Sequence, residues 1–420
     1  MNLRVNLVGV ISALILIATA SLLGAENEPH YELEELIELG LEHSVHTKTE
    51  ELRLENTRSS LITTYLDFLP SASFNVSRHY SDLDTHSAGF NVSKNLSLNE
   101  PRYFNWRRAN IDWENAQLSY EEQVKQTVFD IFSRFIRVAE AQKRVEIQTS
   151  NLTIQERILE QVELLYNLEQ RSLIELKQAE ISLINAQIAY SDAQLQYQTA
   201  RENLFLYLNI EDNGYPLADL DIPLIDEVPE YSKPVEVVKA ENELQKSSIS
   251  LTQSRLNFLP NLSLSYNYSH RHSTELDNDL FDFDKYSDSY TISLSASYPL
   301  FNWIEHRQHH HRNKRNLKSQ ELMLDNLTKN KQQTYEQLIR EWEREKRLFD
   351  LAERRNELAE ETLELSRNKF ELGILSLLEL EQAMTDHLES TIEVTNRYYQ
   401  RLLKQEEIRL LLSEPILGRW

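Results

Sequence analysis

The residues of this chain that could do chemistry are histidines and carboxylates. Histidines crowd into one stretch, where His306 and His310 stand one helical turn apart, a spacing at which two imidazoles can bind one metal ion. His309 and His311 lie beside them, but no carboxylate or third ligand has a defined spacing to the pair. The alternative is a helix start near lipid headgroups, made basic by Arg307, Arg312, Lys314 and Arg315. Both interpretations stay open at this point.

The carboxylates are spread through stretches rich in Lys and Arg, as at Glu360 and Glu361, which is typical of solvated helix faces with surface ion pairs. No Ser-His-Asp arrangement or glycine-flanked serine stands out. The chain has no cysteine, which excludes thiol nucleophiles, disulfides and cysteine-ligated metal sites. Only 7 of 420 residues are glycine, against about 7% on average, which argues against nucleotide-binding loops. We therefore expect neither an enzyme nor a cofactor.

Charge and the N-terminus bear on location. With 44 basic and 67 acidic residues the net charge is −23, so nucleic acid is not an expected partner. Arg4 precedes an apolar run over residues 5–23 with small residues at its end, which predicts a secretory signal peptide over residues 1–25. The alternative is an uncleaved membrane anchor, because the run approaches spanning length.

The chain contains an internal duplication. Phe68-Leu69-Pro70 recurs as Phe258-Leu259-Pro260, Phe104-Asn105-Trp106 recurs as Phe301-Asn302-Trp303, and residues 166–179 align with residues 370–383. Each half has a helical segment, two alternating segments and a long interrupted helical stretch. We assign residues 26–208 to the first half and 236–413 to the second, with a proline-rich segment at 209–235 and a tail at 414–420.

The alternating segments predict two hairpins, over residues 71–98 and 261–298. Apolar and aromatic residues alternate there with Ser, Asn and Thr, which gives each strand one apolar face and one small, uncharged polar face. Each segment has about 9–11 residues, the length that a tilted strand needs to cross a bilayer. Aromatic residues near the segment ends are typical of a membrane interface; they include Phe104, Trp106, Phe301 and Trp303.

Soluble hairpins packed on a core are the alternative, but the acidic connection over residues 273–288 suits an external loop. Four strands do not close a membrane barrel, and open strand edges are not tolerated in hydrocarbon. Several protomers must therefore share one barrel if the hairpins cross a membrane.

Long helices account for most of the remainder. No proline or glycine occurs between Trp106 and Tyr207 or between Trp303 and Leu372. A run of about 60 helical residues extends roughly 90 Å. The first half has a heptad seam in which Ala179, Ala186, Ala193 and Ala200 occupy one position, and small residues there let helices approach closely. The corresponding seam of the second half is mixed, with His387 and Arg401, and leaves the packing face unassigned.

In this order, these features resemble the TolC-type outer-membrane efflux proteins (outer membrane factors). The resemblance covers nearly the whole chain after the signal; its marks are the opening helix at 31–41, Phe-Leu-Pro before each hairpin, Pro299-Leu300-Phe301 and the element at 370–380. It implies an α+β membrane protein: a homotrimer with a 12-stranded β-barrel in the outer membrane and a coiled-coil α-barrel in the periplasm, with residues 209–235 as an equatorial belt. The implied partners are a periplasmic adaptor (membrane fusion) protein, an inner-membrane transporter and outer-membrane lipid.

The resemblance also assigns the tips of the helical hairpins to the periplasmic entrance and to adaptor contact. The tip residues in this sequence are Leu168, Ser172, Leu372, Gly373 and Ser376. The family often places aspartates after the tip glycine; here those positions hold Glu379 and Gln382. We hypothesise that a ring of Glu379 makes the gate cation-selective, the alternative being a solvated surface glutamate. Because Glu169 replaces glycine in the first half, we expect the two tips to turn differently.

The sequence thus predicts the exit duct of a tripartite efflux or type I secretion system, located in the outer membrane of a Gram-negative-type bacterium. A structural or adhesive coiled-coil protein without a conducting pore is the alternative. The cargo, whether drug, metal ion or polypeptide, is left open.

Overall fold

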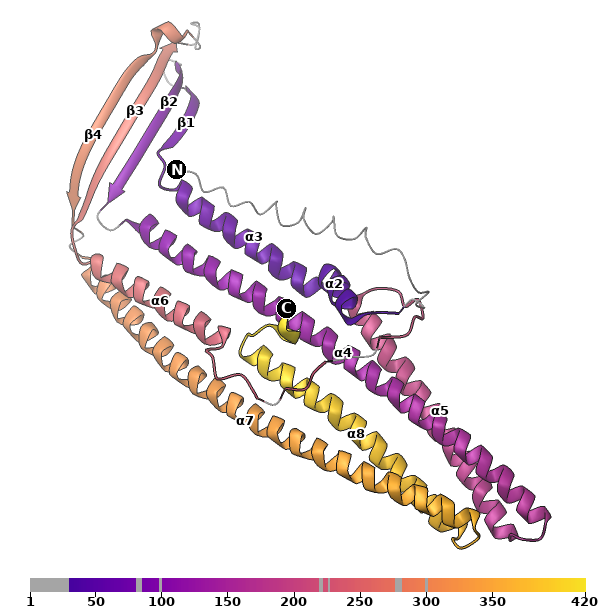
Figure 1. Cartoon of the computed structure of the whole chain (residues 1–420). Coiled ribbons are helices and arrows are strands. Elements are labelled where there is room, and N and C mark those ends of the chain that lie inside the picture. Colours follow the sequence, from indigo (N-terminus) through magenta and orange to yellow (C-terminus); the bar gives the residue numbers. More distant parts are fainter. Residues whose placement is uncertain are drawn as a thin grey trace.

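The computed structural model describes residues 30–80, 85–97, 100–218, 222–225, 227–275, 282–298 and 301–420. The predicted signal peptide lies outside these residues, as do Leu98, Pro299, Leu300 and the middle of the acidic connection. The protein is elongated, with a four-stranded sheet at one end and the turns of two long helical hairpins at the other (Figure 1).

Both halves contain the same elements in the same order. The first consists of α2 (Leu33–His43), α3 (Val45–Leu66), β1 (Ser71–His79), β2 (Thr85–Ser97), α4 (Pro101–Asn167) and α5 (Leu173–Leu208). The second consists of α6 (Val235–Leu256), β3 (Asn261–Glu275), η1 (Phe283–Lys285), β4 (Ser287–Ser297), α7 (Trp303–Glu371), α8 (Leu377–Leu411) and η2 (Ile416–Gly418). Corresponding helices are nearly equal in length, with 67 and 69 residues in α4 and α7 and 36 and 35 in α5 and α8.

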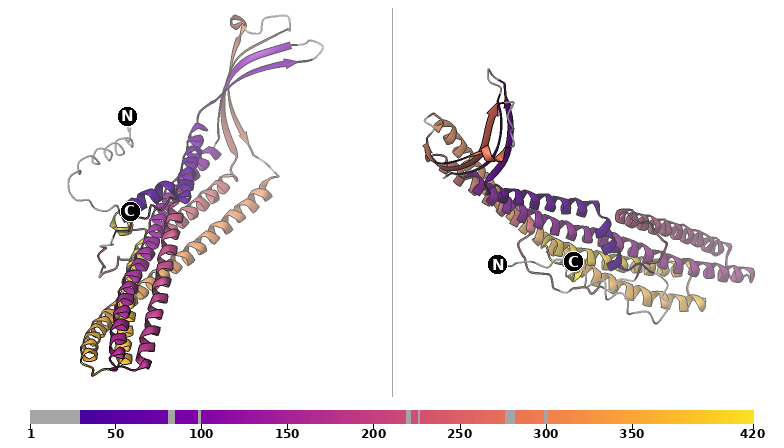
Figure 2. Two further views of the ribbon diagram at one scale, coloured as in Figure 1. Left: turned by 90° about the vertical axis from the view of Figure 1, so that its right-hand side faces the viewer. Right: turned by 90° about the horizontal axis from the view of Figure 1, so that it is seen from above.

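The four strands form one antiparallel sheet in the order β1-β2-β3-β4, with β1 and β4 as its edges. The register keeps side chains of one kind on one face. One row across the sheet contains Ala72, Val92, Tyr268 and Tyr290, and the neighbouring row on the other face contains Ser71, Ser93, Asn267 and Thr291. Seen from above, the sheet curves into an arc (Figure 2).

The two faces of the sheet differ in the contacts that their side chains make. On the polar face, serine hydroxyls pair across strands, with Oγ–Oγ distances of 2.7 Å for both Ser71–Ser93 and Ser263–Ser295. On the apolar face, Ile292 and Leu294 are 69% and 79% exposed, and no helix covers them. The protomer therefore leaves a large apolar surface without a partner.

No helix in the described part of the chain combines the length and the apolar character needed to cross a membrane.

The helices form a layer whose neighbours change along its length. Near the sheet the order is α3, α4, α6, α7, and in the far half it is α5, α4, α8, α7. In α5 the predicted alanine seam is buried, with Ala179, Ala186 and Ala193 exposed by 1%, 4% and 2%. The mixed seam of α8 is also the packing face: Arg401 is 5% exposed and donates a hydrogen bond of 3.1 Å to the carbonyl of Ile225.

The proline-rich segment, Tyr31 and the C-terminal tail meet at mid-height. Tyr31 pairs with the segment through backbone hydrogen bonds to Pro216 and Ala218, of 2.9 and 3.0 Å. The Tyr335 hydroxyl of α7 donates to the carbonyl of Pro229 at 2.8 Å. Beneath this segment lies the largest buried cluster, formed by α2, α4, α5 and η2; it includes Leu36, Ile37, Ile131, Phe135, Leu204, Leu208 and Ile416.

Candidate functional site

The far end of the molecule consists of two turns, one between α4 and α5 and one between α7 and α8. They contain all the residues predicted to contact an adaptor, Leu168 and Ser172 in the first and Leu372, Gly373 and Ser376 in the second. Leu168 and Leu372 are 60% and 75% exposed. Each turn therefore presents a leucine to solvent at its outermost point, where a partner could cover it.

The two turns have the same backbone conformation, so the expectation that they turn differently is wrong. Glu169 has φ 59° and Gly373 has φ 70°, both in the left-handed region. In both turns the next N–H, of Gln170 or Ile374, closes back on a carbonyl of the preceding helix, at 2.8 and 2.9 Å. This is the usual way to end a helix, and it requires a left-handed residue whatever its type. Glutamate adopts it at a cost of about 1–2 kcal/mol.

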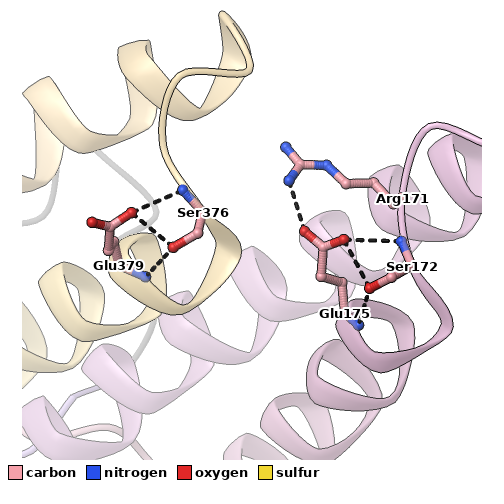
Figure 3. Close-up of polar contacts among 5 residues, drawn as sticks. All are labelled: Arg171, Ser172, Glu175, Ser376 and Glu379. Atoms are coloured by element: carbon pink, nitrogen blue, oxygen red, sulfur yellow. Dashed lines mark hydrogen bonds and ion pairs between the residues drawn. The ribbon is translucent and has the colours of Figure 1, made fainter.

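A capping box begins the helix after each turn (Figure 3). The Ser172 N–H donates to the Glu175 carboxylate at 2.9 Å, and the Glu175 N–H donates to the Ser172 Oγ at 3.2 Å. The pair of Ser376 and Glu379 repeats this, with distances of 3.0 and 3.4 Å. Each box satisfies N–H groups that the helix start would otherwise leave without a partner.

The predicted gate residue Glu379 thus also has a structural role. The hydrogen bond from the Ser376 N–H, and next the one from its hydroxyl, hold the pKa of the Glu379 carboxyl below its usual value. The side chain is exposed, so the carboxylate is ionised at neutral pH and accessible from solvent. Because Glu379 caps the start of α8, its negative charge is held at that end of the helix.

A second carboxylate lies on the same face of α8 as the predicted gate residues. Gln382 is exposed and donates a hydrogen bond of 3.1 Å to Oδ1 of Asp386, which is also exposed. Glu379, Gln382 and Asp386 follow one another at helical spacings of three and four residues, so they form one exposed row. The sequence analysis missed Asp386, although its position one turn after Gln382 could have indicated it.

The two turns are joined to each other within the protomer. The Arg171 guanidinium contacts Glu175 at 2.7 Å and lies over the Phe370 ring of α7. Ser182 of α5 donates to Glu381 of α8 at 2.7 Å. Beneath these contacts lies one apolar cluster; it includes Ile158, Val162, Ala179, Leu363, Phe370, Leu377, Leu380, Ala383 and Met384. The sequence analysis missed Arg171, which the duplication aligns with Leu375.

The aromatic residues predicted at a membrane interface separate into two groups. Phe301 and Trp303, at the start of α7, are 90% and 50% exposed. Phe104 is only 5% exposed and packs against Ile111 and Ile249, so it stabilises the contact of α4 with α6 and is not an exposed anchor. Trp106 is half-buried and packs edge-on to Tyr65, with ring centres 6.0 Å apart.

Comparison with known proteins agrees with this architecture. A family model described as outer membrane efflux protein matches residues 234–414, which is most of the second half. The second half of the chain therefore resembles this family. This confirms the resemblance to TolC-type efflux proteins that the sequence motifs indicate. A search of curated proteins found no significant match.

Several solved structures have the fold of this chain. CusC, studied for conformational changes that accompany folding and transmembrane channel formation, matches with a TM-score of 0.79 and 15% identity over 94% of this chain and 96% of that one. The CmeC outer membrane channel of Campylobacter jejuni matches with a TM-score of 0.73 and 16% identity, over 92% and 86%. The open-state MtrE outer membrane channel of Neisseria gonorrhoeae matches with a TM-score of 0.76 and 16% identity, over 91% and 89%.

The histidine stretch of this protein lies at the sheet end of α7. His310 Nδ1 is 3.2 Å from the Ser254 hydroxyl of α6, and the rings of His306 and His310 both pack edge-on to Phe258. His306 and His310 thus take part in the contact between α6 and α7. In the described residues, no group of three or more His, Cys, Asp or Glu is arranged to hold a metal ion.

Proposed function

We propose that this protein is the outer-membrane exit duct of a tripartite efflux or type I secretion system, through which substrates pass passively from an inner-membrane transporter and its periplasmic adaptor to the exterior. The observation that carries the proposal is the sheet, with an exposed apolar face and a face of small neutral polar residues. The first suits lipid and the second suits a water-filled lumen. The match of residues 234–414 to the outer membrane efflux protein family model supports this function.

The borders of the helical layer support closure into a ring of protomers. Leucine and isoleucine recur every seven residues on α5, at one border, where Ile174, Ile181, Ile188 and Leu195 are all more than half exposed. The same spacing occurs on α7, at the other border; Leu351, Leu358 and Leu365 are 66%, 48% and 61% exposed. Two different surfaces that complement each other form a ring when the rotation closes. We propose a trimer in which α5 packs against α7 of the next copy and the strands form one barrel.

In that trimer, each of the three protomers would contribute one row of Glu379, Gln382 and Asp386 to the narrow end of the duct. Carboxylates repeated around a constriction concentrate negative potential and favour cations. The exposed Leu168 and Leu372 would receive the adaptor, whose docking would move the turns apart and open the gate. Because the cargo is chosen by the inner-membrane partner, a drug, a metal ion and a polypeptide all remain compatible with this duct.

Planar-bilayer recording of the purified protein tests the proposal. We expect discrete cation-preferring conductance steps, and a weaker cation preference in Glu379→Gln. The control is Glu371→Gln, an exposed glutamate at the end of α7 whose loss should leave the preference unchanged. Absence of any conductance, together with unswollen liposomes, would favour the structural or adhesive alternative. Conductance with an unaltered preference in Glu379→Gln would keep the duct and remove the gate assignment.

A further inference from the structure

We propose that exposed basic residues in the first turns of α7 bind the phosphate groups of anionic phospholipids at the helix end of the sheet. We call Arg307, His311, Lys314 and Arg315 the α7 basic collar. The inference rests on the proposed function, because it needs the sheet to lie in a membrane. The α7 basic collar is not part of the proposed conduction pathway or gate.

The first observation is a local reversal of charge. The chain has a net charge of −23, yet the first 16 residues of α7, 303–318, contain Arg307, Arg312, Lys314, Arg315 and Lys318 against the single acid Glu305. Clustered Lys and Arg next to a membrane attract anionic lipid headgroups, at about 1 kcal/mol for each residue close to the surface. The charge of this part of α7 therefore favours an anionic ligand.

The second observation is that the Arg and Lys residues of the collar have no ion-pair partner among the described residues. Among the described residues, no carboxylate lies within ion-pair distance of Arg307, Lys314 or Arg315. Farther along the same helix, Lys318 pairs with Glu321 at 2.9 Å and Lys329 pairs with Asp325 at 2.6 Å. The two lysines that follow the collar on α7 are thus paired, whereas its Arg and Lys residues are not.

The corresponding arginines of the first half contrast with the collar. Arg102 donates to the carbonyl of Asn95 at 2.8 Å, Arg107 lies over the Tyr103 ring, and Arg108 donates to Gln253 at 3.0 Å. These three side chains stabilise the start of α4. The start of α4 therefore offers no counterpart of the collar among these three arginines.

The third observation is the direction in which the collar faces. The α6 side of α7 is occupied by His306, His310 and Asn313, and Asn313 donates to the carbonyl of Ser250 at 3.1 Å. Arg307, His311 and Arg315 follow one another every four residues, so they share a different face. All four collar side chains are exposed. The collar is accessible in the protomer.

The fourth observation is the apolar group at the sheet end of the same face. Trp303 and Ile304 are 50% and 56% exposed, and Phe301 just before them is 90% exposed. Trp303 is one helical turn from Arg307, or about 6 Å along the axis, and Arg315 is about 18 Å away. Aromatic anchors followed by cations are the order found at membrane interfaces. Because the surface potential decays within about 10 Å, Arg307 should contribute most.

The alternative is that a neighbouring copy of the chain covers the collar. In a closed ring, α3 of that copy would lie next to the sheet end of α7. At the end of α3 nearest the sheet, the exposed acid Asp67 is balanced by Arg58, and residues 59–66 between them contain no charge, so this end of α3 has no net negative charge. The exposed acids Glu51 and Glu55 lie farther from the sheet, beyond Arg58. Such a surface does not neutralise the collar, whereas lipid phosphate does.

Titration of the detergent-solubilised full-length protein with a fluorescent phosphatidylglycerol, and separately with a fluorescent phosphatidylcholine, tests the proposal. The variant combines Arg307→Gln, Lys314→Gln and Arg315→Gln. The control combines Arg340→Gln, Arg344→Gln and Arg347→Gln, which removes the same charge from the same helix far from the sheet. We expect phosphatidylglycerol affinity to fall roughly 10-fold or more in the collar variant and to stay unchanged in the control, with phosphatidylcholine unaffected throughout.

Equal losses in the two triple variants would overturn the proposal, since the effect would then be one of net charge. Inorganic phosphate that competes as well as the lipid would assign the collar to free phosphate and overturn the lipid assignment. A collar variant that dissociates into protomers with unchanged phosphatidylglycerol affinity would assign the face to a neighbouring copy. Bilayer recording of the collar variant separates the two proposals: conductance should persist, whereas a wild-type protein that never conducts would refute the duct itself.

Discussion

The guanidinium carbon of Arg171 lies 4.7 Å from the centre of the Phe370 ring, so a cation of the first hairpin rests on an aromatic ring of the second. Arg171 also binds Glu175, the acid of the first capping box, at 2.7 Å. The contact therefore links the cap of α5 to the end of α7. Any motion that separates the two turns within a protomer must break it.

A double-mutant cycle on this pair should show coupling. Arg171 is 16% exposed at its side chain, and a largely desolvated cation on an aromatic face contributes about 1 kcal/mol. We expect Arg171→Ala and Phe370→Leu each to lower the free energy of unfolding. The double variant should lower it by about 1 kcal/mol less than the sum of the two single decreases. Denaturant unfolding followed by circular dichroism measures this. Strict additivity would show that the contact adds nothing beyond packing.

Exchanging residue types at the two left-handed positions should have opposite effects. Glu169→Gly should stabilise the protein by about 1 kcal/mol, because glycine relieves the left-handed backbone strain. Gly373→Ala should destabilise by a similar amount, since a Cβ there meets no atom within 4 Å and only the backbone resists it. Thermal unfolding of the two single variants provides the comparison. A neutral Gly373→Ala would mean that this turn changes conformation at little cost.

The duplication, strand periodicity and alanine seam were readable from the sequence because each is a repeated pattern. The conformation of the two turns could not be predicted in this way, because it depends on which residue ends each helix and on contacts between the two hairpins. Glu169 was expected to alter its turn, yet the hydrogen bonds that end α4 force it into the conformation of Gly373. Phe104 was expected at the surface, yet its motif partner Phe301 alone is exposed, because α6 covers the start of α4. Contacts between elements, such as that of Arg171 with Phe370, have no sequence period.

Charge placed in the exposed heptad stripes should prevent assembly without unfolding the protomer. Ile181 is 58% exposed on α5 and Leu358 is 48% exposed on α7. If they pack together in the trimer, Ile181→Asp or Leu358→Asp buries an unpaired carboxylate there. We expect each variant to elute as a monomer in size-exclusion chromatography with light scattering, with unchanged helical content.

The matched control for assembly is Gln187→Asp, which adds the same charge to a neighbouring exposed face of α5. It should remain trimeric. Trimers in both Ile181→Asp and Leu358→Asp would refute the pairing of α5 with α7 and move the interface to other surfaces of the layer.

Acid should loosen the second turn through Glu379. The pKa of Glu379 is lowered in the folded protein, so its contribution to stability is fully present above the pKa of the unfolded chain and is lost as the pH falls through the folded pKa. Hydrogen exchange of residues 372–380, corrected for intrinsic rates, should show protection at pH 7 that decreases toward pH 3. In Glu379→Gln, which cannot ionise, protection should not change over this range. Equal acid sensitivity in the variant would place the loss of protection in another group. The pKa of Glu175 is likewise lowered, first by the Ser172 N–H and also by Arg171, so the first turn, followed in the same experiment, should also lose protection as the pH falls.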